Sequence, residues 1–151
     1  MTAGKLKKLA VVAKMAEQVS ARELSASHKS HRDCVEQLEK LLRFREEYEH
    51  ALKEKSQTGM SAAEMQDYRK FIGNLNQAIE EQRQHVDSSV ADLAGVEANY
   101  RSRSQRKQAL DHLVDQRLKA EARGKEKAEQ KESDERAMVR YRSDHGDGSG
   151  T

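Results

Sequence analysis

The sequence predicts an all-α protein: a long antiparallel two-helix coiled-coil hairpin with an overhanging C-terminal helix. Alanine, glutamate, lysine, leucine and arginine supply about half of its 151 residues, which is the composition of coiled coils and long helices. Proline, the residue that breaks helix interiors, is absent. Leucine, isoleucine, valine and phenylalanine make up only about a sixth of the chain, too little for a compact core. We therefore do not expect a globular enzyme.

The first predicted helix lies between Leu6 and Leu52, where apolar residues recur at helical intervals. A polar gap at residues 26–32 interrupts the pattern without a helix-breaking residue. The apolar face expected from this spacing consists of Leu6, Leu9, Val12, Ala16, Val19, Val35, Leu38, Leu42 and Leu52.

A turn is predicted at about residues 56–61. Gly59 accommodates the left-handed conformation that ends many helices, and Lys55 lies in the last turn, where the helix dipole favours a cation. Ser61 and Glu64 have the spacing of a capping box that starts a new helix. Stop and start signals this close together predict a helical hairpin.

The second predicted helix continues to about Arg142, so that residues 1–142 form a single coiled-coil domain and residues 143–151 a disordered tail. Its expected apolar face consists of Ile72, Leu75, Ile79, Val86, Val90, Leu93, Val96, Tyr100, Leu110, Leu113, Val114 and Leu118.

A turn centred near Gly59 makes residue i of the first helix face roughly residue 119 − i of the second, which places Tyr48 near Phe71. The first helix then ends opposite about position 115, and about 25 residues overhang without a partner in the chain. Such a segment should fray unless something binds it. Its i,i+4 ion pairs are expected at Asp115–Lys119, Glu121–Lys125 and Glu132–Arg136.

A surplus of apolar residues lies near the turn. Each of two rows with 4-3-4 spacing precedes an expected contact row by one residue, so both rows lie on one face of an antiparallel pair. Two helices bury one stripe each, so we expect these rows to stay exposed as a docking patch, although they could instead widen the core. This turn-proximal patch consists of Gln37, Leu41, Phe44, Tyr48, Phe71, Leu75, Ala78 and Gln82.

Residues 101–127 carry nine cationic and four acidic side chains. A net charge of this sign could face phosphates or an acidic protein. No aromatic residue other than the preceding Tyr100 accompanies these cations, and the acids are mixed among them. A solvated face or a protein-docking surface is therefore favoured over nucleic acid.

No catalytic, cofactor-binding or metal-binding residues are expected. His28, His31 and Cys34 follow one another at helical spacing and could gather metal ligands, but a fourth ligand is not visible, so solvated side chains are favoured. The chain contains no Gly-rich phosphate loop and no nucleophile motif.

The apolar runs are too short to span a membrane, and the start of the chain lacks a signal-peptide cleavage pattern. The single cysteine cannot close an internal disulfide. A reducing, cytoplasmic location is therefore the expectation.

Three segments follow one another in a distinctive order and spacing: Gln37-Leu38-x-x-Leu41 with Tyr48, then Tyr68-x-x-Phe71-Ile72-x-x-Leu75-x-x-Ala78-Ile79-x-x-Gln82, then Gln130-Lys131-x-x-Asp134-Glu135-x-Ala137. In these segments and over residues 5–142 the chain resembles the FliJ family of the flagellar type III protein export apparatus. Position 44 is Phe where Tyr is common in relatives, and Gln82 replaces the His that some relatives carry.

The resemblance implies a non-enzymatic stalk that couples the export ATPase ring to the export gate and assists chaperone and substrate delivery during flagellum assembly. It implies a cytoplasmic monomer that associates peripherally with the inner membrane at the flagellar base and binds neither nucleic acid nor a small-molecule substrate. The turn-proximal patch matches the family's surface for the cytoplasmic domain of the gate. The ring-binding end matches Gln130, Lys131, Asp134, Glu135 and Ala137, named here the terminal segment.

Three alternatives remain open at this point. The chain could be the equivalent stalk of a non-flagellar type III secretion system. It could be a generic coiled-coil scaffold or homodimer, if the 4-3-4 rows pair with those of another copy. A basic nucleic-acid-binding helix pair is the third alternative.

Overall fold

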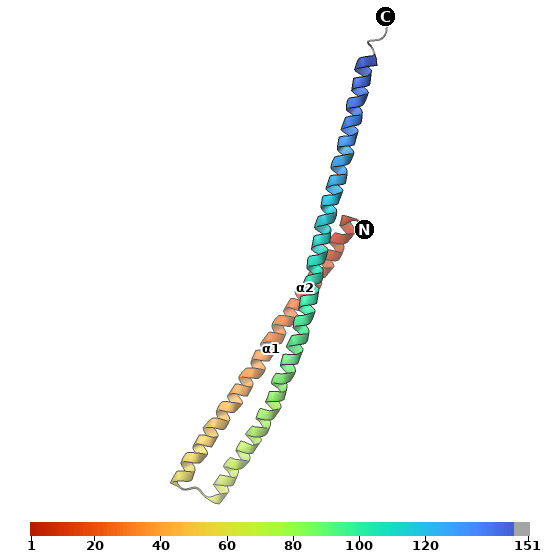
Figure 1. The fold of residues 1–151 in the computed structure, drawn as a ribbon. Helices are drawn as coiled ribbons and strands as arrows, with labels where there is room; N and C mark the ends of the chain where they lie inside the picture. The colour runs from red at the N-terminus through yellow and green to blue at the C-terminus, as the bar shows by residue number, and fades with distance from the viewer. Residues whose placement is uncertain (147–151) are drawn as a thin grey trace. The chain divides into compact units, whose positions relative to one another are not determined.

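The computed structural model describes residues 1–146, which form two long helices and no strand (Figure 1). Helix α1 spans Ala3–Thr58 and helix α2 spans Ala62–Gly146. The predicted all-helical class is confirmed. Helix α2 extends four residues past the predicted end at Arg142, and the rest of the predicted tail, residues 147–151, lies outside the described residues.

The connection between α1 and α2 has the predicted local chemistry. Gly59 adopts a positive φ of 107°, and its backbone N–H donates to the Lys55 carbonyl at 3.1 Å. Ser61 Oγ accepts a hydrogen bond from the Glu64 N–H at 3.1 Å, which satisfies one of the free N–H groups at the start of α2. These contacts confirm the left-handed helix end and the Ser61 cap.

Gly59→Ala is expected to destabilise the protein by about 1 kcal/mol, because a side chain disfavours this φ. A β-carbon at Gly59 would meet no atom within 4 Å, so the cost comes from the backbone alone. Gly95→Ala is the matched control: it lies inside α2 with equally open space, and should stabilise the helix by about 1 kcal/mol. Urea unfolding followed by circular dichroism measures both, and equal shifts would contradict the assignment.

The chain forms two compact units, one of Met1–Met15 with Ser104–Thr151 and one of Ala16–Arg103. Within the second unit α1 and α2 run antiparallel, side by side (Figure 1). The predicted rule pairs positions 20, 31 and 45 with 99, 88 and 74. The observed side-chain hydrogen bonds lie within two residues of this rule and are Asn99–Ser20 at 3.3 Å, His31–Ser89 at 2.8 Å and Arg45–Asn76 at 3.2 Å.

The contact seam between the helices of the second unit is narrow and partly polar. Ile79 is 2% exposed and Leu75 9%, but Ser20 and Ser89 are buried as well. No buried side-chain nitrogen or oxygen of the described residues lacks a hydrogen-bond partner. The seam therefore combines apolar burial with polar pairs that fix the register.

The expected apolar face of the first helix is wrong at three positions of its N-terminal part, whereas Leu6 and Ala16 are half-buried. Leu9, Val12 and Val19 are 42%, 63% and 45% exposed, whereas Ala13 and Ser20 are buried. The seam follows a 3-4 alternation that a coiled coil keeps regardless of side-chain size. Large apolar residues thus lie beside the seam. On the second helix the same correction applies to Val90, Leu113 and Leu118, which are 51%, 47% and 40% exposed.

In the unit of Met1–Met15 with Ser104–Thr151, Ala3 and Ala13 are buried, and residues 115–146 are exposed along their whole length. Two predicted ion pairs are confirmed: Lys119–Asp115 at 3.0 Å and Arg136–Glu132 at 2.7 Å. The expected pair of Glu121 with Lys125 is replaced by a pair with Arg117, at 3.9 Å.

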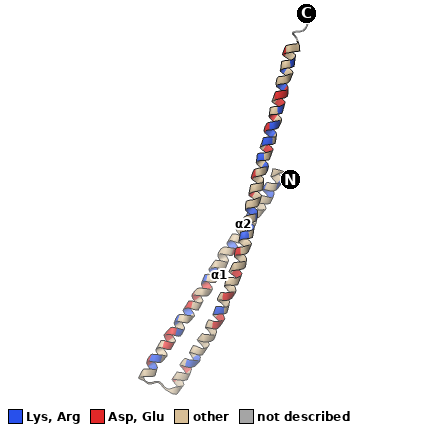
Figure 2. Ribbon diagram, in the orientation of Figure 1, with Lys and Arg blue, Asp and Glu red and all other residues tan. Residues whose placement is uncertain are grey.

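Cations and carboxylates are interspersed along both helices (Figure 2). Neither helix, over its described residues, carries an apolar stretch long enough to cross a membrane.

Candidate functional site

The turn-proximal patch lies within the unit Ala16–Arg103, on facing stretches of α1 and α2. Its aromatic members are the exposed part: Phe44 is 51% exposed, Phe71 41% and Tyr48 37%. The Tyr48 and Phe71 rings contact each other across the two helices, with centroids 4.3 Å apart. The predicted juxtaposition of Tyr48 and Phe71 is thereby confirmed.

Tyr68 extends this aromatic cluster toward the turn. Its ring lies 6.4 Å from that of Tyr48, and Lys55 Nζ lies 5.4 Å from the centre of the Tyr68 ring. Tilted ring pairs and a cation over a ring hold aromatic side chains in defined positions at modest energies. The cluster therefore presents ordered rings at the surface.

The expectation that the whole patch stays exposed is wrong for Leu75, which is 9% exposed. Gln82 is half-buried, and its side-chain amide donates to the Cys34 carbonyl at 2.9 Å. Both occupy seam positions, because the seam of α2 alternates three and four residues through Ile72, Leu75, Ile79 and Gln82. Arg83, which follows Gln82, is exposed.

The remaining three patch residues differ in exposure. Gln37 is exposed, whereas Leu41 and Ala78 are half-buried. Beside them Arg45 occupies a seam position, is half-buried, and donates to Asn76 Oδ1 at 3.2 Å. The seam is thus filled without Phe44 and Phe71, which are left free to contact another molecule.

The terminal segment is part of α2, and all of its five residues are exposed. Within the same stretch Arg136 Nη2 binds Glu132 Oε1 at 2.7 Å. The structure therefore places these five residues on one continuous helix with mixed charge and open to solvent along its length.

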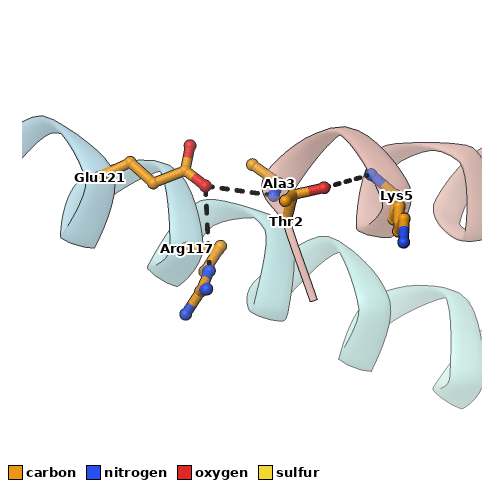
Figure 3. A network of polar contacts seen from close by, with 5 residues as sticks. All are labelled: Thr2, Ala3, Lys5, Arg117 and Glu121. Carbon is orange, nitrogen blue, oxygen red and sulfur yellow. Dashed lines mark hydrogen bonds and ion pairs between the residues drawn. The ribbon is translucent and has the colours of Figure 1, made fainter.

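The N-terminus of α1 is hydrogen-bonded to α2 in the same unit (Figure 3). Glu121 Oε1 accepts a hydrogen bond from the Ala3 N–H at 3.3 Å, and Thr2 Oγ1 accepts one from the Lys5 N–H at 3.3 Å. A carboxylate at a helix N-terminus satisfies a free donor and complements the helix dipole. The i,i+4 rule pairs Glu121 with Lys125, so the sequence analysis did not predict this contact.

The expectation of solvated side chains at His28, His31 and Cys34 is wrong for His31, which is half-buried and hydrogen-bonded across the seam, and Cys34 is a half-buried free cysteine. His31 Nδ1 lies 2.8 Å from Ser89 Oγ, and His28 Nε2 lies 3.6 Å from Glu97 Oε1. The Ser89 hydroxyl donates to the Val86 carbonyl at 2.7 Å, so its oxygen accepts from His31. Among residues 1–146 no group of three or more potential ligands is placed to hold a metal ion.

The basic stretch of residues 101–127 is partly neutralised on the helix surface. Besides the contacts of Arg117 and Lys119, Lys107 Nζ binds Asp111 Oδ2 at 3.2 Å. These are surface i,i+4 pairs, in which Lys107 is half-buried, and each contributes only about 0.3–0.5 kcal/mol.

Comparison with known proteins gives one family. The family model described as "Flagellar FliJ protein" matches residues 2–146 of the chain. Searches among curated proteins and among solved structures returned no significant match.

Proposed function

The chain belongs to the flagellar FliJ protein family, whose members are components of the flagellar export apparatus, and on this premise we propose that it is a stalk-like coupling protein. It bridges the export ATPase ring and the cytoplasmic domain of the export gate, and assists delivery of chaperones and their cargo. It carries out no catalysis and works in the cytoplasm, at the membrane beneath the flagellum.

The observation that carries the gate assignment is the exposure of Phe44, Tyr48 and Phe71 beside a seam that is already filled. Exposed aromatic side chains held in position are typical anchors of protein interfaces. The resemblance assigns this surface to the gate. The resemblance also assigns Leu75 and Gln82 to this surface. In the structure both lie in the seam, where they hold together the two helices that carry the exposed aromatic residues.

The ring assignment is supported by the exposed helix that follows Val114. Its charges are mixed in sign, and its ion pairs Lys119–Asp115 and Arg136–Glu132 join residues of the same helix. Without packing against another element, such a helix is only marginally stable. A partner that surrounds it would supply the missing contacts. We propose that the terminal segment overhangs α1 and enters the ATPase ring.

The function is tested by mixing the purified chain with the purified export ATPase and, separately, with the gate's cytoplasmic domain. We expect co-elution with each partner on size-exclusion chromatography. Co-elution with neither would overturn the proposal. The matching ATPase and gate of a non-flagellar secretion system serve as controls, and tighter binding to those would favour the non-flagellar stalk.

The generic scaffold alternative is separated by sedimentation. We expect a coupling stalk of this kind to be a monomer at micromolar concentration, because its exposed aromatic side chains bind a different protein and not a second copy of the chain. A stable homodimer that buries Phe44 and Phe71 would favour the scaffold instead.

A further inference from the structure

The unit of Met1–Met15 with Ser104–Thr151 has a second apolar face beside its seam. Leu9 precedes the half-buried Ala10, and Leu113 precedes the half-buried Val114. In an antiparallel helix pair, positions that precede the seam by one residue lie on the same face. Val12, which precedes the buried Ala13, joins them, and these three residues are 42%, 63% and 47% exposed in the order Leu9, Val12, Leu113.

A groove of about 490 Å³ lies in the same unit and meets this face at Leu113, whereas Leu9 and Val12 do not line it. Leu6, Leu113 and Ala120 contribute apolar lining to it, and small side chains such as Ala120 leave room for a side chain from outside. The groove is also lined by the cationic side chains Arg117, Lys119 and Arg123. It is named here the basic groove.

The charges around the basic groove are mostly positive, although two of its three cations have acidic partners on the same helix: Arg117 pairs with Glu121 and Lys119 with Asp115. On a helix the neighbours of a residue on the same face are those three and four positions away. None of these neighbours of Leu9, Val12, Leu113 or Ala120 is acidic, and they include Lys5, Lys8, Arg117 and Arg123. The carboxylates that pair with Lys107 and Lys119, Asp111 and Asp115, are not among these neighbours.

We propose that the basic groove binds an amphipathic helix of another protein, with aliphatic side chains along one stripe and carboxylates on both sides of it. The aliphatic stripe would cover Leu9, Val12 and Leu113, as a third helix covers a helix pair. The carboxylates would face the surrounding lysines and arginines.

The same features disfavour two other occupants. A second copy of this chain using the same face would bring cation against cation, which repels. An anionic membrane would match the charge and the protruding Leu9, Val12 and Leu113. A lipid surface, however, supplies no side chain to fill the groove lined by Ala120, whereas a partner helix does.

The basic groove contains no residue of the turn-proximal patch or of the terminal segment. The two proposals therefore depend on different residues, and either can be wrong while the other holds.

The probe is a labelled synthetic helix of three heptads with Leu at a and d and Glu at e and g, whose glutamates disfavour self-pairing. A matched peptide carries Lys at e and g. Fluorescence anisotropy with the full chain should show the Glu peptide binding about tenfold tighter than the Lys peptide, with affinity falling as salt rises. Equal affinity for the two peptides, or no binding of the Glu peptide, overturns the proposal.

Paired variants locate the binding. Leu113→Glu should weaken binding of the Glu peptide roughly fivefold or more. Leu118→Glu adds the same charge at a residue that is 40% exposed and does not line the groove, and should change affinity less than about twofold. Equal losses in both variants count against the groove.

Two further experiments test whether this face binds a membrane or a second copy of the chain instead. If Leu113→Glu abolishes co-sedimentation with phosphatidylglycerol vesicles while the peptide binds both variants equally, the face serves a membrane. If the wild-type chain is a dimer and Leu113→Glu makes it a monomer, the face serves a second copy. Either result overturns the proposal.

Discussion

Replacing Tyr48 and Phe71 together by alanine is expected to weaken binding of the gate's cytoplasmic domain at least about tenfold, which is about 1.4 kcal/mol. Truncation of a single aromatic anchor at an interface commonly costs more than this. The two rings touch at 4.3 Å, so each orients the other, and removing both removes the ordered surface. Isothermal titration calorimetry with the gate domain measures the change.

The same double variant should keep its helices. Both side chains are more than a third exposed, and their mutual contact contributes about 0.5–1.5 kcal/mol. Helix content by circular dichroism should stay within a few per cent of wild type. Val90→Ala is the matched control: Val90 is 51% exposed in the same unit, so this variant should bind the gate normally. Collapse of helix content in the double variant would instead identify the aromatics as core.

The fold was predictable to the extent that its signals are local. Gly59 and Ser61 act through the backbone within a few residues, and each behaves as its type predicts. The register followed from the position of the turn, because an antiparallel pair has no other freedom once the turn is placed. Asn99–Ser20 and His31–Ser89 accordingly lie where simple counting puts them.

The seam was harder to predict because it is built from small and polar residues. Reading apolar side chains alone selected Leu9 and Val12, whereas a 3-4 alternation counted along the helix selects Ala10 and Ala13. The alternation, and not hydrophobicity, is the signal that would have found the seam. Leu75 was expected both on the apolar face of the second helix and, through the 4-3-4 row, on the exposed patch, and its burial confirms the apolar face.

The exposed residues of the candidate site were predicted correctly where their exposure follows from their position one residue before the seam. Phe44 and Phe71 precede seam residues and are exposed, as expected. The contact of Glu121 with the start of α1 could not be predicted, because several hydrogen-bond donors lie within reach of this flexible side chain and helical spacing does not rank them. It pairs with Arg117 and Ala3 instead of Lys125.

Deleting residues 126–151 is expected to abolish association with the export ATPase ring while leaving the gate contact intact. The deletion removes the whole terminal segment. It spares Glu121 and its bond to Ala3, and it spares the unit Ala16–Arg103 with the aromatic cluster. Pull-down of the ATPase and titration with the gate domain measure the two effects separately, and an unchanged ATPase pull-down would remove the ring assignment.

A shorter deletion, of residues 143–151 only, is the matched control and should bind the ring normally, because the terminal segment is retained. Hydrogen exchange tests the cause of the effect. Within the deleted stretch the Arg136–Glu132 pair contributes only about 0.2–0.5 kcal/mol, so amides of residues 126–142 should exchange rapidly in the free chain. Adding the ATPase should slow exchange in this stretch, because a surrounding ring supplies the contacts that an exposed single helix lacks. Equal exchange with and without the ATPase would mean that the ring holds some other part of the chain.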